Sequence, residues 1–199
     1  MIRIASIVEG DGEEKALPIL LRRLRDEWQV VNEFVEPLPP IRVHRDRFIN
    51  RDEEFRKQLL LAAAKCGERG WILVLLDADD DCPVTLATDI HRRAMQYISH
   101  RRLSVVIAKR EYEAWFLAAA RSLDGRRGFC YPDEFVDPES PRDAKGWLRR
   151  NMESRTYSEV LDQPAFTAHF DLQQAFDNSR SFRKLCKEWQ VNVVAVGED

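Results

Sequence analysis

One stretch decides how the rest of the chain is interpreted: Trp71-Ile72-Leu73-Val74-Leu75-Leu76-Asp77-Ala78-Asp79-Asp80-Asp81. Six apolar residues run without a break into four carboxylates within five positions. An apolar run of this length, with Gly70 before it and Pro83 soon after it, is typical of a β-strand buried on both faces. Ligands of open parallel α/β sheets bind beyond the carboxyl ends of such strands. The stretch therefore predicts a buried strand with an acidic site at its end, and a solvated turn that caps the next helix is the alternative.

Strand-like and helix-like segments alternate four times through the first 123 residues. The expected strands are residues 1–8, 41–44, 71–76 and 103–108, and the expected helices are 13–28, 51–68, 83–100 and a segment from about 113 to 123. This order predicts an α/β fold with a mainly parallel sheet and helices on both faces. The remainder predicts a long loop at 124–141, short helices at 144–152, 164–170 and 179–190, and either an edge strand or a packed tail at 191–196. We expect residues 1–123 to form the α/β core, and residues 124–199 a helical elaboration packed on it within one domain.

The composition is that of a soluble globular protein, with 44% apolar residues, 33% charged residues and a net charge of −3. No apolar run reaches the ~18 residues that a membrane span needs. The first residues lack the regions of a signal peptide, so we expect a cytoplasmic protein. The four cysteines and four histidines show neither CxxC pairs nor zinc-ligand spacing, which favours reduced structural thiols.

Basic residues gather in one part of the sequence. Residues 92–127 contain nine Lys or Arg and three acids. An acidic focus beside a basic segment suits a metal site that acts on a polyanion, so we expect nucleic acid as partner. The expected phosphate contacts are Arg92, Arg93, Lys109, Arg110 and, from a later helix, Arg149. The alternative is that these side chains simply solvate helix faces.

Carboxylates also follow two other predicted strands. Glu9 follows the first strand, within Val8-Glu9-Gly10, and Glu111 and Glu113 follow the strand at 103–108. The carboxyl ends of parallel strands share one edge, so these groups should meet those of the acidic turn there. Clustered carboxylates repel unless a cation lies between them, and hard oxygen ligands favour Mg²⁺ or Mn²⁺. For Glu9 the alternative is a helix cap.

Glu111 and Glu113 are about 200° apart on a helix, so only one of them can face this edge. The apolar face that Glu113 shares with Leu117 and Ala120 predicts that Glu113 turns inward, where Lys109 or a second metal would meet it. Glu111 is expected to stay solvated beside Arg110. The alternative for Glu113 is a purely electrostatic role at the helix N-terminus.

Val8-Glu9-Gly10 and Leu76-Asp77-Ala78-Asp79 together resemble the Toprim domain of topoisomerases, primases and OLD-type nucleases. The whole chain looks like a bacterial family of stand-alone Toprim-like proteins of unassigned function. Three further stretches carry that likeness, namely residues 113–118, Asp143-Ala144-Lys145 and Ser181-Phe182-Arg183.

The resemblance implies that Asp77 and Asp79 hold Mg²⁺, and that Glu9 is a general base or a further metal ligand. It also makes Glu113 and Lys145 candidate catalytic residues, although a surface lysine is the alternative at Lys145. The implied activity is metal-dependent hydrolysis of phosphodiesters in nucleic acid, since the chain has no counterpart of the large topoisomerase domain or the primase zinc module.

Two other functions fit the same residues. The chain would also serve as a non-catalytic metal- or nucleotide-binding regulatory subunit of a separate ATPase, because it has no Walker A segment of its own. A phosphorylated receiver, with Asp77 as acceptor and Lys109 beside it, is the third interpretation. It accounts poorly for the length of chain that follows residue 110.

Overall fold

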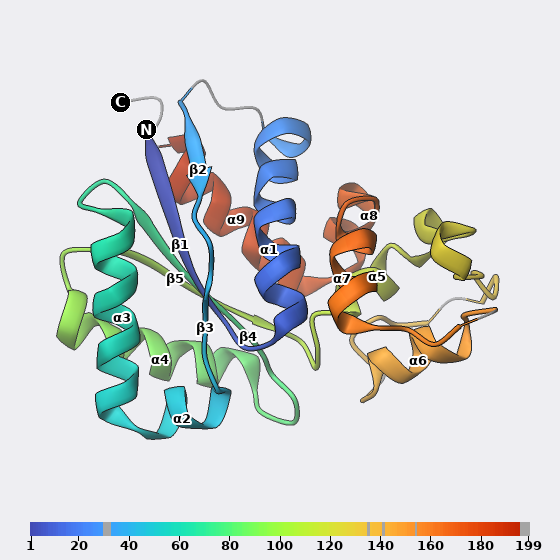
Figure 1. The fold of residues 1–199 in the computed structure, drawn as a ribbon, viewed down its shortest axis with the longest axis horizontal. Helices are drawn as coiled ribbons and strands as arrows, with labels where there is room; N and C mark the ends of the chain where they lie inside the picture. The colour runs from blue at the N-terminus through green and yellow to red at the C-terminus, as the bar shows by residue number, and fades with distance from the viewer. Residues whose placement is uncertain (30–32, 135, 141, 154, 196–199) are drawn as a thin grey trace.

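A parallel β-sheet forms the centre of the computed structural model, which describes residues 1–29, 33–134, 136–140, 142–153 and 155–195. Within these residues the sheet has five strands: β1 (Ile2–Val8), β2 (Val35–Pro37), β3 (Ile41–Arg42), β4 (Trp71–Asp77) and β5 (Arg102–Ala108). Their order is β2-β1-β4-β5, with β3 also pairing with β1, and every pair is parallel (Figure 1). The predicted α/β fold class is confirmed, and the arrangement is Rossmann-like.

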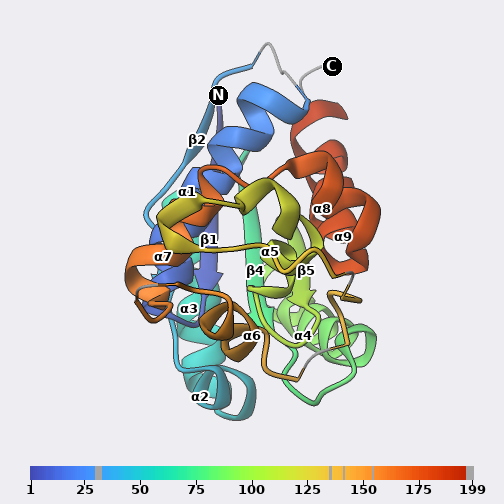
Figure 2. The same cartoon turned by 90° about the vertical axis from the view of Figure 1, so that its right-hand side faces the viewer.

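Two layers of helices cover the sheet (Figures 1 and 2). One layer contains α1 (Asp11–Arg23), α5 (Ala114–Ala118), α6 (Ala144–Arg150), α7 (Glu159–Thr167), α8 (Leu172–Asn178) and α9 (Arg180–Trp189). The other contains α2 (Arg45–Asn50), α3 (Asp52–Cys66) and α4 (Pro83–Ile98).

The central strand explains the two layers. Successive side chains of a strand point to opposite faces, and β4 sends Leu73 into the core under α1 and Val74 into the core under α3. All six of its apolar residues are buried, and burying one large apolar side chain contributes roughly 1.5–3 kcal/mol. An uninterrupted apolar strand is therefore stable only between two helical layers, as the sequence predicted.

Several elements differ from the sequence-based expectation. The first predicted helix forms two elements, α1, which ends at Arg23, and the π-helical turn η1 (Leu24–Trp28). The segment after Glu113 likewise divides into α5 and the 3-10 turn η2 (Ala120–Leu123). β2, α2 and α8 were not predicted, because elements of three to seven residues are too short to show a clear hydrophobic period.

The last third of the chain also departs from expectation. The helix predicted at 164–170 begins earlier, at Glu159, and contains Pro164 in its interior. The segment predicted as strand or tail forms the π-helical turn η4 (Gln190–Val194), so the strand alternative is wrong for its described part, and residue 196 lies outside the described residues. A short 3-10 turn, η3 (Arg126–Gly128), lies within the predicted loop.

Aromatic side chains attach the C-terminal helices to the sheet. Trp189 of α9 packs edge-on against Trp71 with ring centroids 6.4 Å apart, and Phe166 of α7 packs against Phe116 at 5.6 Å. α7 also packs against α1, which brings residues from about position 160 to the end of β1. No described helix combines the length and the apolar content needed to cross a membrane.

Candidate functional site

The carboxyl ends of β1 and β4 lie where the chain direction divides, and we call this edge, with the acids that gather at it, the crevice. From β1 the chain turns to α1 on one face of the sheet, and from the neighbouring strand β4 it turns to α4 on the other face. The two connections therefore diverge at this point. Ligands of open α/β sheets bind at such a switch point. Glu9 follows β1 and Asp77 ends β4, so both predicted acids lie at this crevice.

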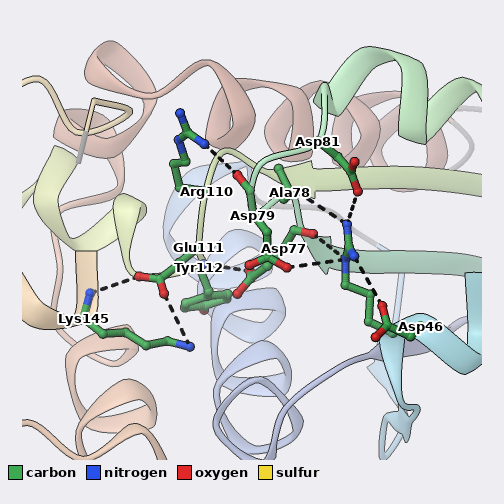
Figure 3. Close-up of polar contacts among 10 residues, drawn as sticks. Asp46, Asp77, Ala78, Asp79, Asp81, Arg110, Glu111, Tyr112 and Lys145 are labelled. Atoms are coloured by element: carbon green, nitrogen blue, oxygen red, sulfur yellow. Dashed lines mark hydrogen bonds and ion pairs between the residues drawn. The ribbon is translucent and has the colours of Figure 1, made fainter. Parts of the chain in front are cut away.

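Asp77 is fixed by the backbone of the next strand connection. Its Oδ1 accepts a hydrogen bond from the N–H of Tyr112 at 2.8 Å (Figure 3). Beside it, Asp79 and Arg110 both adopt left-handed backbone conformations, with φ of 48° and 67°. The Asp79 N–H donates to the Arg110 carbonyl at 3.0 Å, and the Arg110 guanidinium donates to the Asp79 carbonyl at 3.0 Å. Strained non-glycine backbone of this kind concentrates at functional sites.

Glu113 is the most deeply buried acid of the crevice. Its exposed fraction is 0%, so the prediction that it turns inward is confirmed. The Tyr157 hydroxyl donates to its Oε1 at 2.9 Å, and the Gln163 amide lies 3.4 Å from the same atom. Lys109 was expected to contact Glu113, but it does not. The two groups that donate hydrogen bonds to Glu113, the Tyr157 hydroxyl and the Gln163 amide, are both uncharged. A buried carboxylate with only neutral donors is costly when ionised.

Glu13, an acid in the first turn of α1, also belongs to the crevice. It is 6% exposed, and its Oε1 accepts from the Gln163 amide at 3.0 Å, so Gln163 bridges Glu13 and Glu113. A Cβ at Gly10 would clash with the Glu13 carboxylate, and a Cβ at Gly12 would clash with the Gln163 amide oxygen. The two glycines therefore make room for protein side chains at this turn.

The crevice acids perturb one another's protonation. Burial raises the pKa of Glu9 to about 7, and the Asp79 carboxylate adds to the rise. Burial likewise raises the pKa of Glu113 to about 8, and Glu13 contributes. Burial, Glu13 and Glu113 together hold the pKa of Asp77 well above its ordinary value. Carboxylates that raise one another's pKa share a small volume of low polarity, where a cation would be favourable.

Lys145 supplies the positive charge nearest to these acids. Burial disfavours its charged form, but the Glu113 and Asp77 carboxylates outweigh that cost, so the pKa of Lys145 is raised. Its Nζ lies 3.5 Å from Glu159 and 3.9 Å from Glu111, and its backbone N–H donates to Glu111 at 3.0 Å. Glu111 was expected to stay solvated beside Arg110. That prediction is wrong, because the N-terminus of α6 closes over it.

The outer part of the acidic turn is neutralised by arginines. The Asp81 carboxylate pairs with Arg45, whose Nε lies 3.8 Å from Asp79, and Asp80 pairs with Arg110 at 2.7 Å. Asp77 lies between this outer turn and the Lys145–Glu111 pair (Figure 3). Asp80 and Asp81 do not cap α4, which begins at Pro83 after Cys82 without a side-chain cap. Glu9 does not cap α1 either, because Gly10 holds that position.

The donor set fits a hard cation only in part. In the described ranges, the buried oxygens Oε2 of Glu9 and Oε2 of Glu113 have no hydrogen-bond partner. Oxygen atoms left unpartnered beside other carboxylates are what Mg²⁺ or Mn²⁺ would satisfy. Yet the described part of the chain holds no group of three or more His, Cys, Asp or Glu side chains already placed around one ion. The acids are therefore gathered at one edge without being arranged around a single point.

The basic residues expected to form one phosphate-binding segment are dispersed. Arg93 stacks over Phe55 at 4.1 Å on the α3–α4 side of the sheet, and Arg92 pairs with Asp89 at 3.3 Å on the surface of α4. Arg149 is exposed on α6. Arg110 lies beside the acidic turn, where it pairs with Asp80, whereas Lys109 lines a groove between α4 and α9. The segment does not form a single basic surface, because its two strand-flanking helices lie on opposite faces of the sheet.

Four residues of the site had no signal in the sequence. Tyr157 and Gln163 come from the region of α7, Arg45 begins α2, and Glu159 begins α7. Tyr157, Gln163 and Arg45 each lie far along the chain from the acids that they contact, and Glu159 contacts Lys145. A polar residue in a short helix cannot be distinguished from a surface residue until the packing of that helix is known.

Searches of curated proteins and of solved structures found no match to this chain. A family model described as "Domain of unknown function (DUF4276)" matches residues 8–189, which include every residue of the crevice. The chain therefore belongs to the DUF4276 family.

Proposed function

We propose that this protein is a divalent-metal-dependent phosphodiesterase that acts on nucleic acid, with the crevice between β1 and β4 as its active site. The observation that carries the proposal is the gathering of Glu9, Asp77 and Glu113 at the switch point of a parallel sheet, with two buried oxygens that lack a partner. The resemblance of Val8-Glu9-Gly10 and Asp77-x-Asp79 to the Toprim motifs supports the same chemistry.

Asp77 and Glu113 would hold the ion, with Asp79 at the outer rim and Glu9 beside it as the general base. When bound, a divalent ion stabilises the charge of a phosphodiester under attack and lowers the pKa of a coordinated water. The pKa of Glu9, about 7, allows it to accept a proton from an attacking water near neutral pH. Lys145, half-buried and charged, would contact a phosphate oxygen.

Gln163 and Tyr157 would position the acids. Each donates to Glu113, and Gln163 also holds Glu13, so the two contacts fix how far apart these carboxylates lie. Both donors are neutral, which leaves the negative charge of the crevice available to a cation.

The proposal is tested by incubating the purified chain with labelled single- and double-stranded DNA and RNA, with Mg²⁺, Mn²⁺ or EDTA. We expect cleavage with a divalent ion and none in EDTA. Replacing a general base typically lowers the rate by about 10²- to 10⁴-fold, and we expect this of Glu9→Gln. The matched control is Glu14→Gln, in the first turn of α1, and this variant should cleave normally.

A direct binding measurement with Mn²⁺ separates the remaining outcomes. Binding that depends on Asp77, without cleavage of any nucleic acid, would replace the proposal with the regulatory-subunit function. If the chain neither binds Mn²⁺ nor cleaves nucleic acid, the crevice is not a metal site and the proposal is wrong.

A further inference from the structure

A second concave surface lies along β5, on the far side of that strand from β4. A groove of about 840 Å³ runs between α4 and α9. Leu103, Val105 and Ile107 of β5 form its floor, Ala87 lies on the α4 wall, and Ser181 and Lys184 lie on the α9 wall. None of the crevice acids lines it. It is therefore a separate feature of the molecule.

The backbone of β5 is unpaired along this groove. β5 is the last strand of the sheet in the described ranges, with β4 as its neighbour. The Ala108 carbonyl accepts from the Ala78 N–H at 2.9 Å, so it points toward β4. Backbone groups of successive residues point alternately to the two sides of a strand, so those of Leu103, Val105 and Ile107 point into the groove. No described residue pairs with them.

An open strand edge is a template for another strand, and proteins usually block it with charges, bulges or a covering element. Here residues of α4 and α9 line the two walls of the groove that runs along the edge. The segment from Leu103 to Ile107 spans roughly 16 Å at about 3.3 Å per residue. That length accommodates a strand of about five residues.

The charge of the groove favours an acidic occupant. Arg92, Lys109, Arg180 and Lys184 lie along it, against two acids. Arg92 pairs with Asp89 and Lys184 with Glu188, so among the described residues Lys109 and Arg180 are the lining cations without an ion pair. Both acids are already engaged. Glu188 pairs with Lys184 and accepts from Ser104, and Glu139 accepts from the backbone N–H of Arg180 at 2.7 Å.

The lining also distinguishes a peptide from a nucleic acid strand. Single-stranded nucleic acids are bound mainly by stacking on several aromatic side chains, and in the part of the chain that the structure describes no Phe, Tyr or Trp lines this groove, with His91 as its single aromatic ring. Unpaired backbone groups and an apolar floor match an extended peptide instead.

We propose that an extended acidic segment of a partner protein binds in this groove as an additional strand on the free edge of β5. Side chains alternate along such a strand. Small apolar residues would face Val84 and Ala87 of α4, and acidic residues would face Arg180 and Lys184 of α9. Val84, which is 75% exposed, lies at the mouth where the first of them would enter.

Amide hydrogen exchange tests the free edge directly. In the isolated chain the amides of Leu103, Val105 and Ile107 should exchange at least tenfold faster than those of Ser104 and Val106, which are paired with β4. Equal protection at all five positions would show that the edge is already paired and would overturn the proposal.

The occupant is tested by selecting binders from a phage-displayed library of random octapeptides against the full chain, without divalent ions. We expect selected peptides to alternate apolar and acidic residues, and to slow exchange at Leu103, Val105 and Ile107 by tenfold or more. Arg180→Glu should weaken their binding at least tenfold, and Ala87→Trp should abolish it. The matched controls, Lys57→Glu on α3 and Gln96→Trp on α4, are exposed outside the groove and should change nothing.

Three results would overturn the proposal. The first is a selection whose binders leave the β5 amides unprotected. The second is displacement of the peptides by a ten-nucleotide oligothymidylate, which would make the groove a path for nucleic acid. The third is a dimer of the wild-type chain that Ala87→Trp converts to a monomer, which would make a second copy the occupant.

Discussion

Two fully buried carboxylates in this molecule have opposite surroundings. Asp162 of α7 is 0% exposed and pairs with Arg127 at 2.6 Å and with Arg155, and its second oxygen accepts from the Ser158 N–H at 2.8 Å. Glu113 is also 0% exposed, but it has two neutral donors on one oxygen and no described partner for the other.

The difference indicates what each acid is for. The charge of Asp162 is balanced within the protein, so its contacts fasten the loop after η2 to α7. Glu113 has no ion pair among the described residues, and Lys145 offsets its charge only in part, so burial and the neighbouring Glu13 raise the free energy of the ionised form. A fold keeps such a group where something else binds. We therefore expect Asp162 to contribute stability and Glu113 to serve the proposed metal site.

The largest expected effect is that of Asp162→Asn. It leaves two arginines without their carboxylate, and because both are partly exposed to water we expect a loss of about 3 kcal/mol in the free energy of unfolding, at the low end for a broken buried pair. Urea denaturation measures this loss. Asp177→Asn, on the exposed side of α8, is the control and should stay within about 0.5 kcal/mol. If the loss in the free energy of unfolding is as small as that of the control, the ion pairs of Asp162 do not stabilise the fold.

Mn²⁺ should stabilise the wild-type chain at pH 8. An ion at about 100 times its Kd stabilises the folded state by about 2.7 kcal/mol, which calorimetry would record as a rise in Tm. Glu113→Gln should lose most of this rise, whereas Asp162→Asn, although less stable, should keep it. A rise that survives in Glu113→Gln would place the ion elsewhere and break the comparison.

Without metal, the stability of the chain should fall as pH rises through the range of the crevice acids. The pKa values of Glu9 and Glu113 are raised from 4.5 to about 7 and about 8, so between these limits the folded state binds more protons than the unfolded state. The free energy of unfolding therefore decreases from about pH 5 to pH 8. In EDTA, Glu113→Gln should melt at a higher temperature than wild type at pH 8 and match it at pH 5, where Glu113 is already neutral. If Glu113→Gln and wild type melt at the same temperature at pH 8 as well as at pH 5, ionised Glu113 does not destabilise the fold.

The smallest effect is expected at the outer turn. Asp80 is 76% exposed and pairs with Arg110, and exposed pairs contribute about 0–1 kcal/mol. Asp80→Asn should thus alter neither the urea midpoint nor the rise in Tm with Mn²⁺ beyond about 0.5 kcal/mol. If Asp80→Asn loses the rise in Tm with Mn²⁺, the metal site includes Asp80 as well as Asp77.

The sequence by itself determined the sheet and the edge at which the site lies. Six apolar residues before Asp77 require burial on both faces, and the alternation of strands with helices makes the sheet parallel, so the positions of Glu9 and Asp77 at one edge follow from short-range pattern alone. The inward turn of Glu113 followed from helical geometry in the same way.

Only the tertiary structure decided which partners those acids have. Gln163 reaches Glu13 across 150 residues, Tyr157 reaches Glu113 across 44, and the pairing of Lys145 with Glu111 depends on where α6 begins. Such contacts are set by how helices pack, which depends on the shape of every intervening side chain. Periodicity in the sequence reports which face of an element is buried, and it carries no information about which distant polar group that face will meet.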